Sequence, residues 1–177
     1  REQVAGGAEL AININGSPYR RGKQRIRESM LETRAADASV PVVYVNQVGG
    51  QDELVFDGGS VVFSESGKLI ARSPQFVEDV SVVDIEVPLT YRMRSLDPRG
   101  RPRRERIEVV PISSASRAEG RPVERSIAEL TDEIGEVWDA LVLATRDYVV
   151  KNGFTDVVVA LSGGVDSTLV CALAVDA

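Results

Sequence analysis

The feature that most constrains the fold is a glycine-containing loop near the end of the sequence. Residues 156–160, Asp-Val-Val-Val-Ala, have the composition of a buried strand, and residues 168–175 have that of a helix. The loop between them, Ser162 to Ser167, is Ser-Gly-Gly-Val-Asp-Ser. Glycine lets the backbone turn sharply and approach a ligand closely. Because a helix N-terminus attracts anions, the order strand, loop, helix predicts a phosphate site at the edge of an open α/β sheet.

Composition narrows the class of protein. A chain of 177 residues is long enough for one domain or for parts of two. Its net charge of −6 argues against a general nucleic-acid binder. We expect no membrane association, because no apolar run reaches the roughly 18 residues that a membrane helix needs. The one cysteine, Cys171, is expected to be a buried apolar thiol and fits a cytoplasmic location.

Residues 1–90 have the pattern of a single unit in which strands outnumber helices. One helix is expected over residues 23–37, with Ile26, Met30 and Leu31 as its apolar positions. A loop is expected from Gly49 to Asp57, and Gly67 marks a hairpin turn. Strands are expected at 9–14, 41–46, 60–63, 69–72 and 80–87. This order of elements indicates a layered α/β or α+β domain.

Residues 91–123 differ in composition from the rest of the chain. Arginine, proline and serine crowd together there, and a solvated linker is the expectation. Contact between the arginines and a phosphate or nucleic acid is the alternative, although no aromatic residues are interleaved for base stacking.

Residues 124–152 are expected to be rich in helix. One face of this helix carries apolar and aromatic residues at helical spacing, which predicts core packing. These residues are Ile134, Val137, Trp138, Leu141, Thr145 and Tyr148. Asn152-Gly153 is a typical helix stop.

The Ser162–Ser167 loop resembles the pyrophosphate-binding loop of the N-type ATP pyrophosphatases. Its backbone N–H groups would form a concave nest for pyrophosphate, and its hydroxyls would donate to the phosphate oxygens. Asp166 would hold Mg²⁺, because a carboxylate repels a bare polyphosphate. The predicted ATP-binding residues are Ala160, Leu161, Ser162, Gly163, Gly164, Val165, Asp166 and Ser167. The plain alternative is a glycine turn with Asp166 or Ser167 as an N-cap.

Two blocks in the first half, residues 13–23 and 44–58, resemble the nitrilase-type glutaminase domain of the glutamine-dependent NAD synthetases. That resemblance implies a fold in two parts. Residues 1–90 would be the C-terminal part of a nitrilase-like α-β-β-α sandwich. Residues 91–123 would be a linker, and 124–177 the start of a Rossmann-like ATP-pyrophosphatase domain. We therefore expect the chain to be incomplete.

The same resemblance implies an activity. ATP would adenylate nicotinic acid adenine dinucleotide, and ammonia from glutamine would displace AMP to give NAD. The family also implies Mg²⁺, a homo-oligomer and no nucleic-acid partner. Two alternatives stay open: another ATP-pyrophosphatase ligase, such as a GMP synthetase or a tRNA-thiolating enzyme, and a non-catalytic assembly or binding module.

The resemblance also suggests which residues bind glutamine. Ser17 would contact its amino or carboxylate group, and Lys23 its carboxylate. The family's catalytic Cys, Glu and Lys would lie upstream of Arg1, so we expect no catalytic residue in this chain. Without the resemblance, Ser17 would be a turn residue before Pro18 and Lys23 a solvated helix start.

Overall fold

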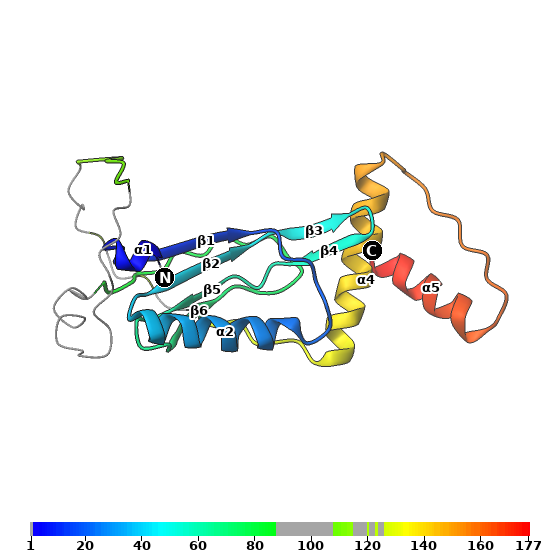
Figure 1. The fold of residues 1–177 in the computed structure, drawn as a ribbon. Helices are drawn as coiled ribbons and strands as arrows, with labels where there is room; N and C mark the ends of the chain where they lie inside the picture. The colour runs from blue at the N-terminus through cyan, green and yellow to red at the C-terminus, as the bar shows by residue number, and fades with distance from the viewer. Residues whose placement is uncertain (1, 88–107, 115–119, 121–122, 124–125) are drawn as a thin grey trace.

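A computed structural model describes residues 2–87, 108–114, 120, 123 and 126–177 (Figure 1). Most of the predicted linker, residues 91–123, therefore lies outside the described residues. None of the described helices is both long and apolar enough to cross a lipid bilayer. The elements are α1 (Glu2–Ala5), β1 (Ala11–Asn15), α2 (Lys23–Ala38), β2 (Val42–Asn46), β3 (Val48–Gln51), β4 (Leu54–Asp57), β5 (Val61–Phe63), β6 (Leu69–Arg72), α4 (Glu133–Lys151) and α5 (Val165–Asp176).

A four-stranded sheet in the order β1-β2-β5-β6 forms the centre of the first half. β1 and β2 are parallel, and the other pairs are antiparallel. β3 and β4 form a separate antiparallel hairpin directly after β2, which reaches toward α4 (Figure 1). Both strands of this hairpin contact α4.

α2 runs from Lys23 to Ala38 without a glycine or proline inside it. Gly22 precedes it in the left-handed region, with φ 71°. At the other end Ser39 is also left-handed, with φ 51°, and its N–H reaches back to the last carbonyls of the helix. These ends set α2 along one face of the sheet, where Leu31 and Ala35 are buried.

Three apolar clusters hold the described residues together. The largest lies between α2 and the sheet, and it includes Tyr44 and Phe63. A second covers the opposite face of the sheet, where Val83 packs near Ile70. The third joins Phe76 to Leu143 of α4, with Tyr19 at its edge. Because the third cluster contains residues from both halves, α4 packs on the first half rather than standing apart from it.

A buried ion pair ties α2 to the hairpin. The Arg27 guanidinium donates to both carboxylate oxygens of Asp57, at 3.0 and 3.1 Å. Their side chains are 3% and 0% exposed. The guanidinium also lies 5.5 Å from the ring centroid of Tyr44, a cation–π distance. Desolvated charges of this kind are costly unless fully paired, so each partner depends on the other.

The predicted secondary structure is largely confirmed in the first half. The 23–37 helix and the strands near 9–14, 41–46, 60–63 and 69–72 are present within a few residues. The hairpin turn at Gly67, with φ 83°, is also confirmed. The expected loop from Gly49 to Asp57 was wrong, because β3 and β4 pair there around a turn at Asp52. In α2, Ile26 and Met30 are exposed, and Arg27 and Gln24 occupy the buried face instead.

Two predicted strands are not strands. Residues 80–87 contain no assigned strand, although Val83 and Ile85 still cover the sheet. Residues 156–160 are extended but unpaired within the described part of the chain. A parallel strand needs a neighbour to accept its hydrogen bonds, and the described residues contain none at this place.

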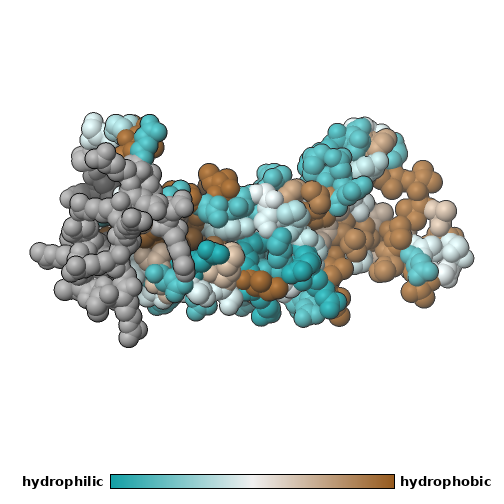
Figure 2. All heavy atoms as spheres, viewed as in Figure 1, coloured by the Kyte–Doolittle hydropathy of each residue, from teal (hydrophilic) through white to brown (hydrophobic). Residues whose placement is uncertain are grey.

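The predicted packing of α4 was wrong in orientation. Its buried face contains Glu136, Ala140 and Leu143, whereas Ile134 is 84% exposed and Tyr148 59% exposed. α5 has no fully buried residue among those described, so Cys171 is only half-buried rather than buried. Figure 2 shows apolar side chains gathered on the surface at the end of the molecule where α4 and α5 lie.

The buried pair gives a stability prediction. Asp57→Asn keeps the shape of the side chain but leaves the Arg27 charge buried and unpaired. We expect a loss of about 3–5 kcal/mol in the free energy of unfolding, measured by urea denaturation.

Arg21→Ala serves as the control, because the Arg21–Glu133 pair is exposed, with side chains 67% and 72% accessible. Removing such a pair costs about 0–1 kcal/mol. Equal losses in the two variants would contradict the importance of the Arg27–Asp57 pair.

Candidate functional site

Ser17 is placed by a polar chain that begins at the buried pair. The Asn46 amide lies between Asp57 and Ser17, donating to the Asp57 carboxylate at 3.2 Å. The same Asn46 accepts from the Ser17 N–H at 2.9 Å and donates to its carbonyl at 3.3 Å. With both backbone groups of Ser17 held, only its side chain is left to contact a ligand. These hydrogen bonds therefore fix the position of the loop after β1 from its buried side.

Lys23 closes the same loop. It is the first residue of α2, and its Nζ donates to the Pro18 carbonyl at 2.7 Å. Pro18 follows Ser17 directly, so the two predicted glutamine-binding residues lie close together. The side chains are half-buried, which leaves them accessible. We call residues 17–23 the glutamine loop.

Tyr19 anchors the glutamine loop to the third apolar cluster. Its ring meets Phe76 edge-on, with centroids 5.4 Å apart, and its N–H donates to Val55 at 2.6 Å. Burial raises the pKa of Tyr19 from 10 to about 12, and the nearby carboxylates of Glu136 and Asp57 add to the shift. The hydroxyl has no partner within the described part of the chain, so its ionised form would be strongly disfavoured.

Sequence reasoning missed Asn46, Asp57 and Arg27 as supports of this loop. Asn46 and Asp57 lie in the 44–58 block that carries the family resemblance, at the ends of β2 and β4. Polar residues that end strands on one side of a fold are a usable signal. Arg27 gave no such signal, because a lysine or arginine in a helix is normally exposed.

A pair of left-handed glycines lets the chain pass close to α2. Gly58 and Gly59 have φ values of 61° and 59°. A Cβ on Gly59 would lie 2.8 Å from the Gln24 side chain, which donates to the Gly59 carbonyl at 3.0 Å. The backbone of the 57–59 turn thus packs against the Gln24 side chain in the first turn of α2.

The predicted loop at Ser162–Ser167, which we call the nucleotide loop, leads into a helix as expected, although no strand precedes it among the described residues. Gly163 is left-handed, with φ 82°, and no heavy atom lies within 4 Å of the position of a Cβ there. α5 begins at Val165, earlier than expected, and its N-cap Gly164 offers no side-chain cap among the described residues. The first N–H groups of α5 are therefore available to an anion.

Hydroxyl groups of this loop form hydrogen bonds with one another and with its backbone. The Ser162 and Ser167 oxygens are 3.0 Å apart, and the Ser167 oxygen also accepts from the Ser162 N–H at 3.2 Å. Ser167 and Thr168 both donate to the Gly164 carbonyl, at 3.1 and 2.8 Å. The hydrogen bonds between Ser162 and Ser167 join the two ends of the loop. All of its residues except Ser167 are exposed.

Asp166 lies in the first turn of α5, with its carboxylate exposed. No group of three or more acidic, histidine or cysteine side chains gathers anywhere in the described residues. Mg²⁺ commonly binds through one or two carboxylates together with substrate phosphates and water, so a single exposed aspartate fits such an ion. Ala160 and Leu161 lead into the loop and are exposed.

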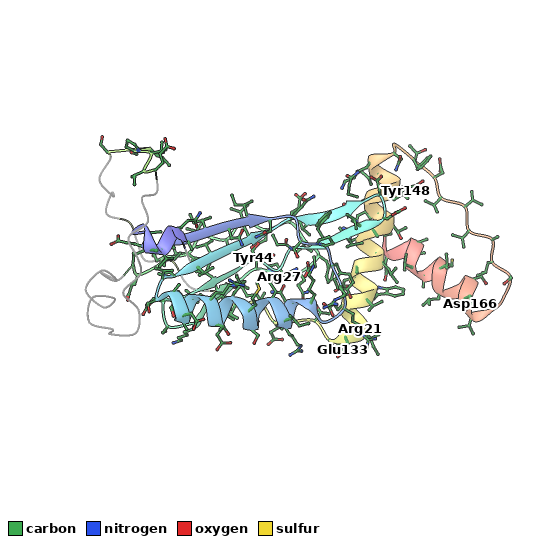
Figure 3. All side chains as sticks on the ribbon, in the orientation of Figure 1. Arg21, Arg27, Tyr44, Glu133, Tyr148 and Asp166 are labelled. Atoms are coloured by element: carbon green, nitrogen blue, oxygen red, sulfur yellow. The ribbon has the colours of Figure 1, made fainter. Side chains whose placement is uncertain are left out.

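The two predicted sites lie apart. In Figure 3, Asp166 lies at the far end of α5, while Arg27 and Tyr44 lie under the sheet near the glutamine loop. α4 lies between these regions, and its contacts with α5 and with the β3–β4 hairpin are extensive. The structure brings Ser17 and Lys23 together and keeps the nucleotide loop separate from them.

Comparison with known families fits this division. Residues 3–95, more than half of the 177, match the carbon-nitrogen hydrolase family model. The chain belongs to the carbon-nitrogen hydrolase family. Residues 137–177 match a second model, that of NAD synthase. The second match includes most of α4 and the nucleotide loop.

Similar proteins match across both halves. The glutamine-dependent NAD(+) synthetase of Aquifex aeolicus is 47% identical over 180 residues, covering 100% of this chain and 31% of that protein. That of Thermotoga maritima is 40% identical, covering 97% and 30%. The structure of the Acinetobacter baumannii glutamine-dependent NAD+ synthetase with adenosine diphosphate matches with a TM-score of 0.69 at 33% identity, covering 99% of this chain and 28% of that one. The chain spans about a third of the length of these curated relatives.

The buried phenol of Tyr19 gives a pH prediction. Because its pKa is raised in the folded state, the unfolded chain loses the proton first as the pH rises. The stabilising contribution is complete below pH 10 and is lost as the pH rises to about 12. Urea unfolding across this range should show a fall in stability that Tyr19→Phe reduces.

Tyr148→Phe is the matched control, because Tyr148 is 59% exposed. An identical pH dependence in the wild type and in Tyr19→Phe would show that Tyr19 titrates normally.

Proposed function

We propose that this chain is the central part of a glutamine-dependent NAD+ synthetase. In the proposed reaction ATP adenylates the carboxylate of nicotinic acid adenine dinucleotide, releasing pyrophosphate, and ammonia displaces AMP to form NAD. Glutamine hydrolysis supplies the ammonia. The observation that carries the proposal is the order of the two halves: a glutaminase-like loop and a pyrophosphate-type loop in one chain, with relatives that match across both.

In the glutaminase-like half, Ser17 and Lys23 would hold the amino and carboxylate groups of glutamine. The half-buried Lys23 ammonium already donates to a carbonyl beside Ser17, and a substrate carboxylate would be a stronger acceptor. The cysteine, glutamate and lysine that break the amide bond in this family would come from residues upstream of Arg1. This half of the chain therefore binds and orients rather than reacts.

In the second half, residues 160–167 would bind ATP. The uncapped N–H groups of α5 would face the phosphates, and the Ser162 and Ser167 hydroxyls would donate to their oxygens. Asp166 would hold Mg²⁺, which neutralises charge on the phosphates when it is bound. These residues contain no nucleophile, so their work is positioning and charge stabilisation.

The proposal extends to the setting of the enzyme. We assign residues 1–90 to the glutaminase domain, 91–123 to a linker and 124–177 to the synthetase domain. The complete protein is proposed to be a cytoplasmic homo-oligomer, with no nucleic-acid or membrane partner. By itself the 177-residue chain should form no NAD, because it spans only about a third of its relatives.

Two substitutions in the complete enzyme separate the sites. Asp166→Ala should lower NAD formation from both glutamine and free ammonia by about 10²–10³-fold, because both routes need ATP. Ser17→Ala should raise the KM for glutamine by about tenfold, the loss of one hydrogen bond to a charged group, and leave ammonia-driven synthesis unchanged. NAD formation is measured with each nitrogen source.

Two further serine and aspartate variants are the controls. Asp156→Ala removes an exposed carboxylate that contacts only Thr155 among the described residues, and Ser29→Ala removes an exposed hydroxyl from α2. Neither should change the rates. Equal loss of ammonia-driven synthesis in Ser17→Ala would contradict the division of labour, and no NAD from the wild type would contradict the function itself.

A further inference from the structure

The glutamine loop is held by a residue from the second half of the chain. Glu136, in the first turn of α4, is 5% exposed. Its Oε2 accepts a hydrogen bond of 3.1 Å from the N–H of Gly22, which is 114 positions away in sequence. A carboxylate removed from water needs such a donor, so the burial of Glu136 depends on the position of Gly22.

Gly22 is also the N-cap of α2, directly before its first residue. In the described structure α2 has no side-chain cap at this end and no acidic residue in its first turn. A helix N-terminus is stabilised by nearby negative charge. Glu136 supplies that charge from α4, which the sequence of α2 does not do. The start of α2, and with it Lys23, is therefore placed by a partner from outside the glutaminase-like half.

A second contact holds the same loop on the same helix. Tyr19 lies in the apolar cluster with Ala140 and Leu143, one and two turns further along α4. The loop is thus fixed to α4 at Tyr19 by apolar packing and at Gly22 by a hydrogen bond. Lys23 follows Gly22 directly, so a shift of Gly22 moves the ammonium that we assign to the glutamine carboxylate.

The other end of α4 is fixed as well. Asp147 accepts from the Gly50 N–H at 2.6 Å, and Lys151 donates to the Gly50 carbonyl at 2.5 Å. Asp147 and Lys151 also pair with each other at 3.0 Å. This clamp prevents α4 from sliding along the hairpin, so Glu136 presents its carboxylate from a fixed point.

We propose that Glu136 is a positioning residue for glutamine binding, acting through Gly22 on Lys23. The inference rests on the proposed function, because it requires Lys23 to contact glutamine. It assigns a role in the glutamine site to the helix that leads into the nucleotide loop. A purely structural role for Glu136 would instead affect both nitrogen sources alike.

The test is a comparison of nitrogen sources in the complete enzyme. In Glu136→Ala we expect the KM for glutamine to rise about tenfold, with the kcat and KM for ammonia-driven synthesis unchanged, because one charge-assisted hydrogen bond is lost. Glu136→Gln keeps an acceptor at the same place but loses the charge, so its KM should lie between those of the wild type and Glu136→Ala. Glutamate release from glutamine, measured directly, should show the same order of the three proteins.

Glu133→Ala is the matched control. It removes a carboxylate from the same end of α4, but one that is exposed and lies 3.6 Å from Arg21 rather than on Gly22. It should leave the KM for glutamine unchanged. An unchanged KM in Glu136→Ala would overturn the inference, as would a parallel loss of ammonia-driven synthesis in both Glu136 variants.

Failure of the proposed function has a different signature. If the wild type forms no NAD from ammonia, the synthetase assignment fails, whatever the variants do. If the wild type forms NAD and releases glutamate while Glu136→Ala matches it in both assays, only the positioning role fails.

Discussion

The buried Arg27–Asp57 pair is the constraint on which the glutamine loop depends. Two charges taken out of water must satisfy each other, and this fixes the distance between α2 and the end of β4. Asn46 extends the same network from Asp57 to both backbone groups of Ser17. The position of this surface loop is thus set by a buried network of hydrogen bonds. Such a network holds the loop atoms in place more firmly than packing within a loop usually does.

The two halves of the chain are joined by a helix as well as by chain connectivity. The N-terminal part of α4 contacts the glutamine loop, and the C-terminal part of α4 contacts the β3–β4 hairpin. α5 packs against α4. A displacement of α4 would therefore reach both predicted sites. This geometry makes α4 the physical connection between the loop proposed to bind glutamine and the helix that follows the loop proposed to bind ATP.

The sequence predicted elements well where periodicity and glycine agree. The helix at 23–37 and a glycine turn before the last helix were both predicted from residue spacing and turn residues, although Ile26 and Met30 are exposed and α5 begins earlier, at Val165. The β3–β4 hairpin was missed because Gly49, Gly50, Asp52 and Glu53 have the composition of a loop, and only their pairing reveals strands. Arg27 was missed because burial of a charge depends on a partner 30 residues away. The face of α4 was misassigned because the residues that pack on the first half are Glu136, Ala140 and Leu143, whereas Ile134 and Tyr148 are exposed.

The hydrogen bonds at Gly50 bear on which substitutions the hairpin can tolerate. Asp147 and Lys151 grip the backbone N–H and carbonyl of that residue and no side chain of the hairpin. These hydrogen bonds do not depend on hairpin side chains, whereas the apolar contact of α4 with Val48 and Val55 does. Gly50 itself tolerates substitution poorly, since a Cβ there would lie 3.1 Å from the Ala144 Cα and from the Asp147 Cβ. The hydrogen-bonded part of the α4 attachment therefore requires glycine at position 50, while its apolar part requires that the hairpin residues facing α4 stay apolar.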